Sequence, residues 1–93
     1  MTIEQNIKVL KILQHYDARG QMLKCVEELS ELSTAIMQHL NKGGNKDAIF
    51  EEIADVEIML AQMRAILPYG QNVFDEEIDR KLDRQLARIG AEK

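Results

Sequence analysis

Two acidic motifs, Glu28-Leu29-Ser30-Glu31 and Glu52-Ile53-Ala54-Asp55, are separated by twenty residues that contain a Lys-Gly-Gly turn. Acids three apart in a helix lie on one face, so each motif directs a pair of carboxylates to one side. In an antiparallel helical hairpin the numbers of facing residues have a constant sum. Glu31 with Glu52, and Glu28 with Asp55, both give 83, and the midpoint of that register falls close to Gly43-Gly44. The sequence therefore predicts a hairpin in which four carboxylates meet and demand a cation.

Length and composition set the outer bounds of the fold. The chain has 93 residues, with 45% hydrophobic residues, 4% aromatics and a single proline, which favours one all-α domain over residues 1–93. A chain of this size buries only roughly two thirds of its unfolded surface, so it often completes its core by association. We therefore expect a four-helix bundle-like domain with a central antiparallel helix pair, completed by oligomerisation.

Charge, cysteine content and hydropathy exclude several functional classes. The formal net charge of −4, with no dominant basic face, argues against nucleic-acid binding. A single cysteine, Cys25, cannot form an internal disulfide and is expected to be a small buried core residue. No segment resembles a signal peptide or a transmembrane run, so a cytoplasmic location is the expectation.

Apolar periodicity and helix-breaking residues predict four helices. The first begins after Thr2, whose spacing to Gln5 fits a capping box, and Gly20 is expected to separate it from the second. The expected ranges are 3 to 17 or 18, about 21–40, about 46–67, and from 72 or 75 to about 90.

The apolar faces of the two central helices differ. The second helix has one apolar arc, expected to be its packing face, with Glu28 and Glu31 outside it; the arc comprises Cys25, Val26, Leu29, Leu32, Ser33, Ile36, Met37 and Leu40. The third is apolar almost all round, and Glu52 lies within its stripe with Asp55 at the edge. Glu28 and Glu31 alone fit an ordinary solvated face equally well. Glu52 and Asp55 favour a buried salt bridge or a metal site, because acids seldom occupy such positions unpaired.

The fourth helix has one narrow apolar seam, formed by Ile78, Leu82, Leu86 and Ile89. Basic residues stand around this seam, at Arg80, Lys81, Arg84 and Arg88. Two interpretations are open. The basic residues form a charged outer face interleaved with Asp79 and Asp83, or they bind phosphate.

Two segments carry a resemblance to a known family: Val26-Glu-Glu-Leu-Ser-Glu-Leu-Ser-Thr-Ala-Ile36 and Glu51-Glu-Ile-Ala-Asp-Val56. They resemble the paired Glu-x-x-Glu and Glu-x-x-Asp motifs of MazG-like, all-α nucleoside triphosphate pyrophosphohydrolases. The resemblance extends to His15-Tyr16 before the motifs and Lys81-Leu-Asp-Arg84 after them.

That resemblance implies Mg²⁺, with Mn²⁺ as an alternative, held by Glu28, Glu31, Glu52 and Asp55. It also implies cleavage of a (deoxy)nucleoside triphosphate to the monophosphate and pyrophosphate, a role in clearing the nucleotide pool, and homodimers or homotetramers with sites near subunit contacts. The phosphoribosyl-ATP pyrophosphohydrolases of histidine synthesis share the architecture, but this sequence does not contain their alanine-rich acidic motif.

The chemistry assigns roles to individual side chains. Glu31 is the candidate for orienting or deprotonating the attacking water. Lys81, Arg84 and, one turn before Glu28, Lys24 are candidates for neutralising the substrate phosphates. Fewer sequence observations support the roles of these basic residues than support the roles of the acidic ones.

Other classes of site fit less well or stay open. Neither histidine follows a glutamate by three, which excludes a di-iron carboxylate bundle, and no glycine-rich phosphate loop is present. The Asn41–Glu52 segment has Lys46 where a calcium loop needs glycine. A non-catalytic helical oligomer, or a module that binds nucleotide or a basic partner, stays open as the alternative function.

Overall fold

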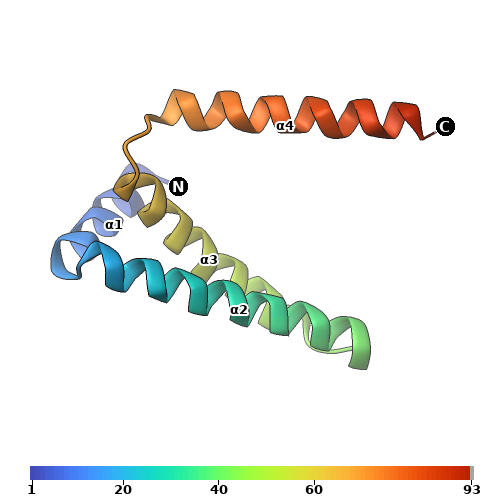
Figure 1. Cartoon of the computed structure of the whole chain (residues 1–93). Helices are drawn as coiled ribbons and strands as arrows, with labels where there is room; N and C mark the ends of the chain where they lie inside the picture. The colour runs from blue at the N-terminus through green and yellow to red at the C-terminus, as the bar shows by residue number, and fades with distance from the viewer. Residues whose placement is uncertain (93) are drawn as a thin grey trace.

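The computed structural model describes residues 1–92, nearly all of which lie in four α-helices (Figure 1). The helices are α1 (Ile3–His15), α2 (Ala18–Lys42), α3 (Lys46–Ile66) and α4 (Gln71–Ala91). No strand occurs among residues 1–92, so the predicted all-α class is confirmed. None of these helices combines the length and apolarity needed to cross a membrane.

The start of α2 differs from the sequence prediction. Gly20 was expected to separate the first two helices, but α2 begins at Ala18 and Gly20 lies in its first turn. Asp17 is the N-cap, and its carboxylate accepts a hydrogen bond from the Gly20 backbone N–H. A Cβ on Gly20 would lie 2.9 Å from that carboxylate oxygen. The glycine therefore makes room for the cap of the helix rather than breaking it.

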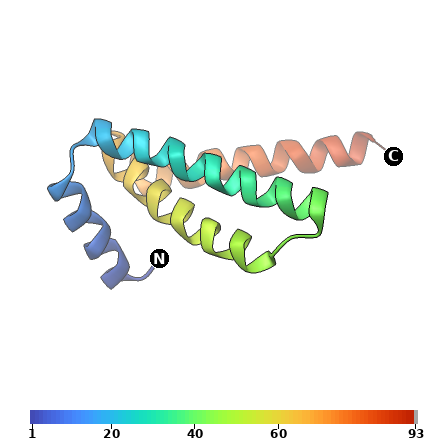
Figure 2. The ribbon, with the colours of Figure 1, turned by 90° about the horizontal axis from the view of Figure 1, so that it is seen from below.

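The central helices α2 and α3 form an antiparallel hairpin (Figure 2). A buried hydrogen bond joins them far from their connecting loop: Gln21 Nε2 donates to Gln62 Oε1 at 2.6 Å. The numbers of these two residues also add up to 83, which agrees with the register predicted from the acidic motifs.

The α2–α3 loop is short and closely fitted to the end of α2. Gly43 ends α2 in the left-handed conformation, with φ of 63°, and the side chain of Asn45 caps α3. A Cβ on Gly44 would lie 3.4 Å from the backbone of Gln38, because the loop runs back along α2. His39 Nδ1 lies 3.1 Å from the Gly44 carbonyl oxygen, and this hydrogen bond holds the loop against the end of α2.

The hydrophobic core is small and lies where α1 and α2 meet α3. Its buried apolar residues are Val9, Cys25, Val56 and Met59. Burial of Cys25 confirms the prediction for this residue. Three polar residues are equally buried: Gln21, Glu28 and Gln62.

The predicted packing face of α2 is wrong in one respect. Most of the apolar arc expected to pack inward is exposed, including Val26 at 62% and Leu40 at 70%. The side of α2 that contacts α3 includes Cys25 from that arc, but its other buried residues are Gln21 and Glu28, which lie outside the arc. Apolar periodicity identified a face that burial would stabilise, but no other part of residues 1–92 packs on most of it.

The last helix, α4, is joined to the rest at one corner. Phe74 is half-buried there, with the Arg64 guanidinium 4.9 Å from the centre of its ring and Tyr69 edge-on at 6.2 Å. Beyond that corner α4 runs apart from the hairpin (Figure 1), and it contains no buried residue. Its predicted apolar seam is exposed throughout, from Ile78 to Ile89.

The left-handed Gly43 predicts a specific stability effect. Gly43→Ala forces a side chain into this conformation and should reduce the free energy of unfolding by about 1 kcal/mol. Gly90→Ala is the matched control, because a Cβ there meets nothing and the residue is helical. It should cause no loss. Urea denaturation of both variants checks this, and equal loss in both would contradict it.

Candidate metal centre

Three of the four predicted acids come together where α2 and α3 face each other. One carboxylate oxygen each from Glu28, Glu31 and Glu52 lies within 4.8 Å of the others. Glu28 is buried, Glu52 is half-buried and Glu31 is exposed. The cluster therefore has an inner wall and an open side.

Glu28 is the innermost member of the cluster. It is only 8% exposed, because it lies on the side of α2 that contacts α3, one turn after Cys25. Its Oε1 forms an ion pair with Lys24 Nζ at 3.2 Å. Its Oε2 is buried and has no hydrogen-bond partner. A buried carboxylate oxygen without a partner is costly, so this atom itself indicates a missing ligand.

Glu52 repeats this feature from the opposite helix. Its Oε2 is also buried and without a hydrogen-bond partner. The two residues with an orphaned oxygen, one on α2 and one on α3, thus belong to the same three-carboxylate cluster. Hydrogen bonds within the protein do not account for the arrangement, whereas a cation between the two helices would.

Lys24 supplies one positive charge at the edge of the cluster. Its ammonium pairs with Glu28 and, at 3.6 Å, with Glu27. These two carboxylates, Glu28 first, raise the pKa of Lys24. One ammonium against the three clustered carboxylates leaves an excess of negative charge.

That excess is visible at Glu31. A hydrogen bond with the neighbouring Glu28 carboxylate is the main cause of a raised pKa at Glu31, followed by the negative charge of Glu28 and, with a smaller contribution, that of Glu52. The shift favours the protonated form, which is the response expected of like charges held together. A bound cation would relieve the same repulsion.

The donor set fits a hard divalent ion. All three groups are carboxylates, and Mg²⁺ prefers oxygen ligands while retaining several waters. The exposed side at Glu31 leaves space for those waters or for phosphate oxygens. The residues present therefore fit Mg²⁺, with Mn²⁺ as the alternative of similar ligand preference.

A groove of about 500 Å³ opens beside the cluster, within the size range of small-molecule sites. Glu31 and Glu52 line it, together with Glu27, Ser30, Thr34, Ala35, Gln38 and Ala48. The hydroxyls of Ser30 and Thr34 donate to the backbone of their own helix, so their oxygens are left to accept. The groove thus offers small apolar residues, acceptors and one amide.

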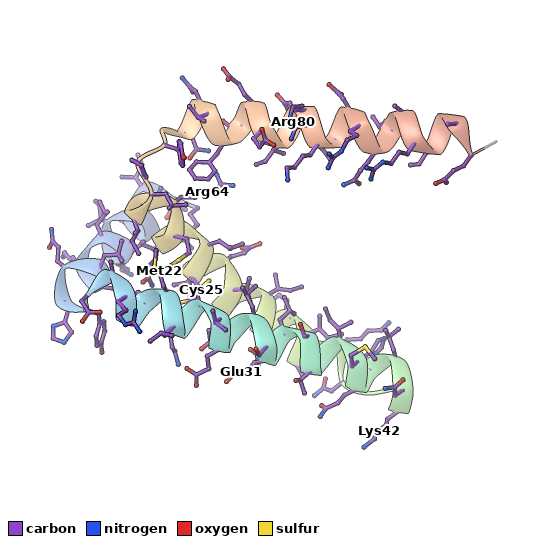
Figure 3. All side chains as sticks on the ribbon, in the orientation of Figure 1. Met22, Cys25, Glu31, Lys42, Arg64 and Arg80 are labelled. Atoms are coloured by element: carbon purple, nitrogen blue, oxygen red, sulfur yellow. The ribbon has the colours of Figure 1, made fainter. Side chains whose placement is uncertain are left out.

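Several predicted site residues lie outside the cluster. Asp55 is exposed and is not part of the three-carboxylate group. Lys81 and Arg84 are exposed on α4. Figure 3 shows Glu31 on the side of the hairpin away from α4, which carries the labelled Arg80. Within one chain, these basic residues and the acids are therefore not brought together.

Local pairing accounts for some of the other candidates. Arg80 forms an ion pair with Glu77 on its own helix, as expected for a charged outer face. The ring of His15 packs edge-on against Tyr16, with ring centres 4.6 Å apart, at the end of α1.

Sequence reasoning missed the inward orientation of Glu28 and the Gln21–Gln62 pair. A signal for both was present. Residues at alternating spacings of four and three form the side of α2 that faces α3: Gln21, Cys25, Glu28, Leu32, Ala35 and His39. This line contains polar residues, so apolar periodicity alone did not identify it as the packing face of α2.

Comparison with known proteins gives no relative for this chain. No protein-family model matches it, and neither does any curated protein or any solved structure.

Charge repulsion in the cluster predicts an unusual mutational effect. Two carboxylates at this separation repel by roughly 3 kcal/mol at an effective dielectric constant of 20. Glu52→Gln should therefore raise the melting temperature in chelator, by at least about 4 °C if 1 kcal/mol is recovered. It should also weaken the stabilisation that Mg²⁺ gives the parent protein.

Melting curves of parent and variant, each with chelator and with Mg²⁺, test this prediction. Glu51→Gln, a change at the neighbouring exposed acid, is the control and should leave both curves unchanged. A strongly destabilised Glu52→Gln, together with a parent that ignores Mg²⁺, would mean that the acids are structural.

Proposed function

We propose that this protein is a Mg²⁺-dependent nucleoside triphosphate pyrophosphohydrolase of the MazG-like type, acting in the cytoplasm. The observation that carries the proposal is the pair of buried, unpartnered oxygens, Glu28 Oε2 and Glu52 Oε2, in one carboxylate cluster beside an open groove. The resemblance of the paired acidic motifs to that family supplies the reaction type.

Glu28 and Glu52 would hold the ion from the two facing helices, and Glu31 would complete the set from the exposed side. Mg²⁺, when bound, lowers the pKa of a coordinated water and offsets charge on phosphoryl oxygens. Glu31 orients the attacking water and accepts its proton, because it lies at the open edge of the cluster where water enters. Asp55, one turn after Glu52, is the fourth ligand of the proposal. The water oxygen forms a bond to the α phosphorus, the bond from that phosphorus to the α–β bridging oxygen breaks, and pyrophosphate leaves with the bridging oxygen.

The surroundings of the cluster suggest how the nucleotide lies. Lys24 stands one turn before Glu28 and is half-exposed, so its ammonium can neutralise phosphate charge while remaining close to the acids. The groove extends toward Gln38 on the other side of Glu31. We place the phosphates near Lys24 and the nucleoside in the groove.

The reaction is tested by measuring pyrophosphate release from a panel of ribo- and deoxynucleoside triphosphates with and without Mg²⁺. Glu28→Gln, Glu31→Gln, Glu52→Gln and Asp55→Asn should each reduce turnover by at least roughly a hundredfold. Glu27→Gln should have little effect, because Glu27 is not one of the four acids that the proposal assigns as metal ligands. Release of inorganic phosphate, or full activity in chelator, would refute this mechanism. Nucleotide binding without cleavage would instead favour the non-catalytic binding module.

We also propose that the active form is a homo-oligomer. A dimer is the smallest assembly with closed symmetry. Two unpaired apolar faces support this: the exposed arc of α2 and the seam of α4. In one chain Glu31, at the exposed edge of the cluster, lies on the side of the hairpin away from α4 (Figure 3). Lys81 and Arg84 would therefore reach substrate phosphates only from a second copy.

Light scattering at micromolar concentration should give the mass of a dimer or tetramer for the parent chain. Leu82→Glu combined with Leu86→Glu places two charges in the exposed seam of α4 and should lower that mass. Ala87→Glu, on the opposite face of α4, is the control and should keep the parent mass. A folded, monomeric parent would contradict the proposal.

A further inference from the structure

The hairpin contains a polar contact that the proposed chemistry does not use. Gln62 is only 1% exposed, the most buried side chain among residues 1–92, and Gln21 is 8% exposed. Gln21 Nε2 donates to Gln62 Oε1 at 2.6 Å, and Gln62 Nε2 lies 3.8 Å from Met59 Sδ. Two amides so deeply buried are unusual in a core this small, and nothing in the reaction requires them.

We propose that this glutamine pair is a positioning device that sets the register and rotation of α3 against α2, and so holds Glu52 opposite Glu28 and Glu31. Buried polar pairs of this kind can fix the register of paired helices where apolar contacts cannot. The inference rests on the proposed metal site but concerns two residues outside it.

The apolar surface of α3 is the reason that such a device is needed. That helix is apolar almost all round, so a shifted or rotated α3 would still place apolar side chains against α2. A shift by one turn would set Gln62 against Cys25 and Gln21 against Ile66. Both amides would then be buried without partners, which disfavours the shifted state. Only the observed register satisfies the pair.

The pair also lies at the end of the hairpin that the loop does not hold. The loop contacts between His39 and Gly44 fix the far end. Gln21 is seven residues before Glu28, about 10 Å along α2, and Gln62 is ten residues after Glu52, about 15 Å along α3. The acid cluster therefore lies between two points of fixation.

The test replaces both amides by side chains of similar length, in Gln21→Met combined with Gln62→Met. The double variant should remain helical, with an unchanged or higher melting temperature, because a buried polar pair adds specificity more than stability. Its affinity for Mn²⁺, measured by electron paramagnetic resonance without substrate, should fall at least tenfold. Gln62→Met alone strands the Gln21 amide and should melt below the double variant.

A second readout follows the helix pair directly. Spin labels at Arg19→Cys and Glu57→Cys, both exposed, report the separation of α2 and α3 in a Cys25→Ala background diluted with unlabelled chain. Their distance distribution should broaden in the double variant. Met59→Leu removes the sulfur that accepts from Gln62 Nε2 but keeps the Gln21–Gln62 hydrogen bond, and it should preserve both the distribution and the Mn²⁺ affinity.

A double variant that keeps the parent's Mn²⁺ affinity and distance distribution would overturn the positioning role. Failure of the double variant to fold would also overturn it, because the pair would then be needed for stability itself. A parent that binds no Mn²⁺ would refute the metal site alone. The spin-label distances would still decide whether the glutamines set the register.

Discussion

Burial of the Glu28 carboxylate between α2 and α3 is the constraint on which the candidate site depends. The residue lies on the side of α2 that also contains Cys25, so the helices cannot pack without enclosing a negative charge. Lys24 reaches one oxygen, and the other has no partner within the protein. Like charges from Glu31 and Glu52 add to this cost. Such a feature costs stability, and it creates a place that could hold a cation.

The elements of the fold were largely predictable because they depend on local signals. The capping box at Thr2, the left-handed Gly43 and the Asn45 cap all act within one turn of chain, and the capping box is present as expected. The register of α2 against α3 was also predictable, because only a few alignments of two facing helices bring acids at these fixed spacings together. Gly20 was misjudged because its function depends on the neighbouring Asp17 side chain rather than on glycine flexibility.

The orientation of α2 could not be obtained in the same way. A helical projection identifies which face is apolar, but it does not identify what covers that face. The most apolar arc of α2 is exposed, and the mixed line through Gln21, Cys25 and Glu28 packs on α3. For the same reason the sequence placed Glu28 outside the packing face and grouped Asp55 with the other acids, whereas the structure brings together Glu28, Glu31 and Glu52. Side-chain reach and burial, rather than spacing alone, decide membership of the cluster.

The isolated position of α4 has a consequence for how the molecule opens. Beyond the contacts of Phe74 in its first turn, α4 retains only its own hydrogen bonds and local pairs, such as Arg80 with Glu77, whereas most helical stability in proteins comes from packing. In a single chain the amide protons of α4 would exchange with solvent by local fraying, while those near Val56 and Met59 would await opening of the hairpin. Slow exchange along α4 would therefore measure the strength of whatever surface covers it, independently of the stability of the hairpin.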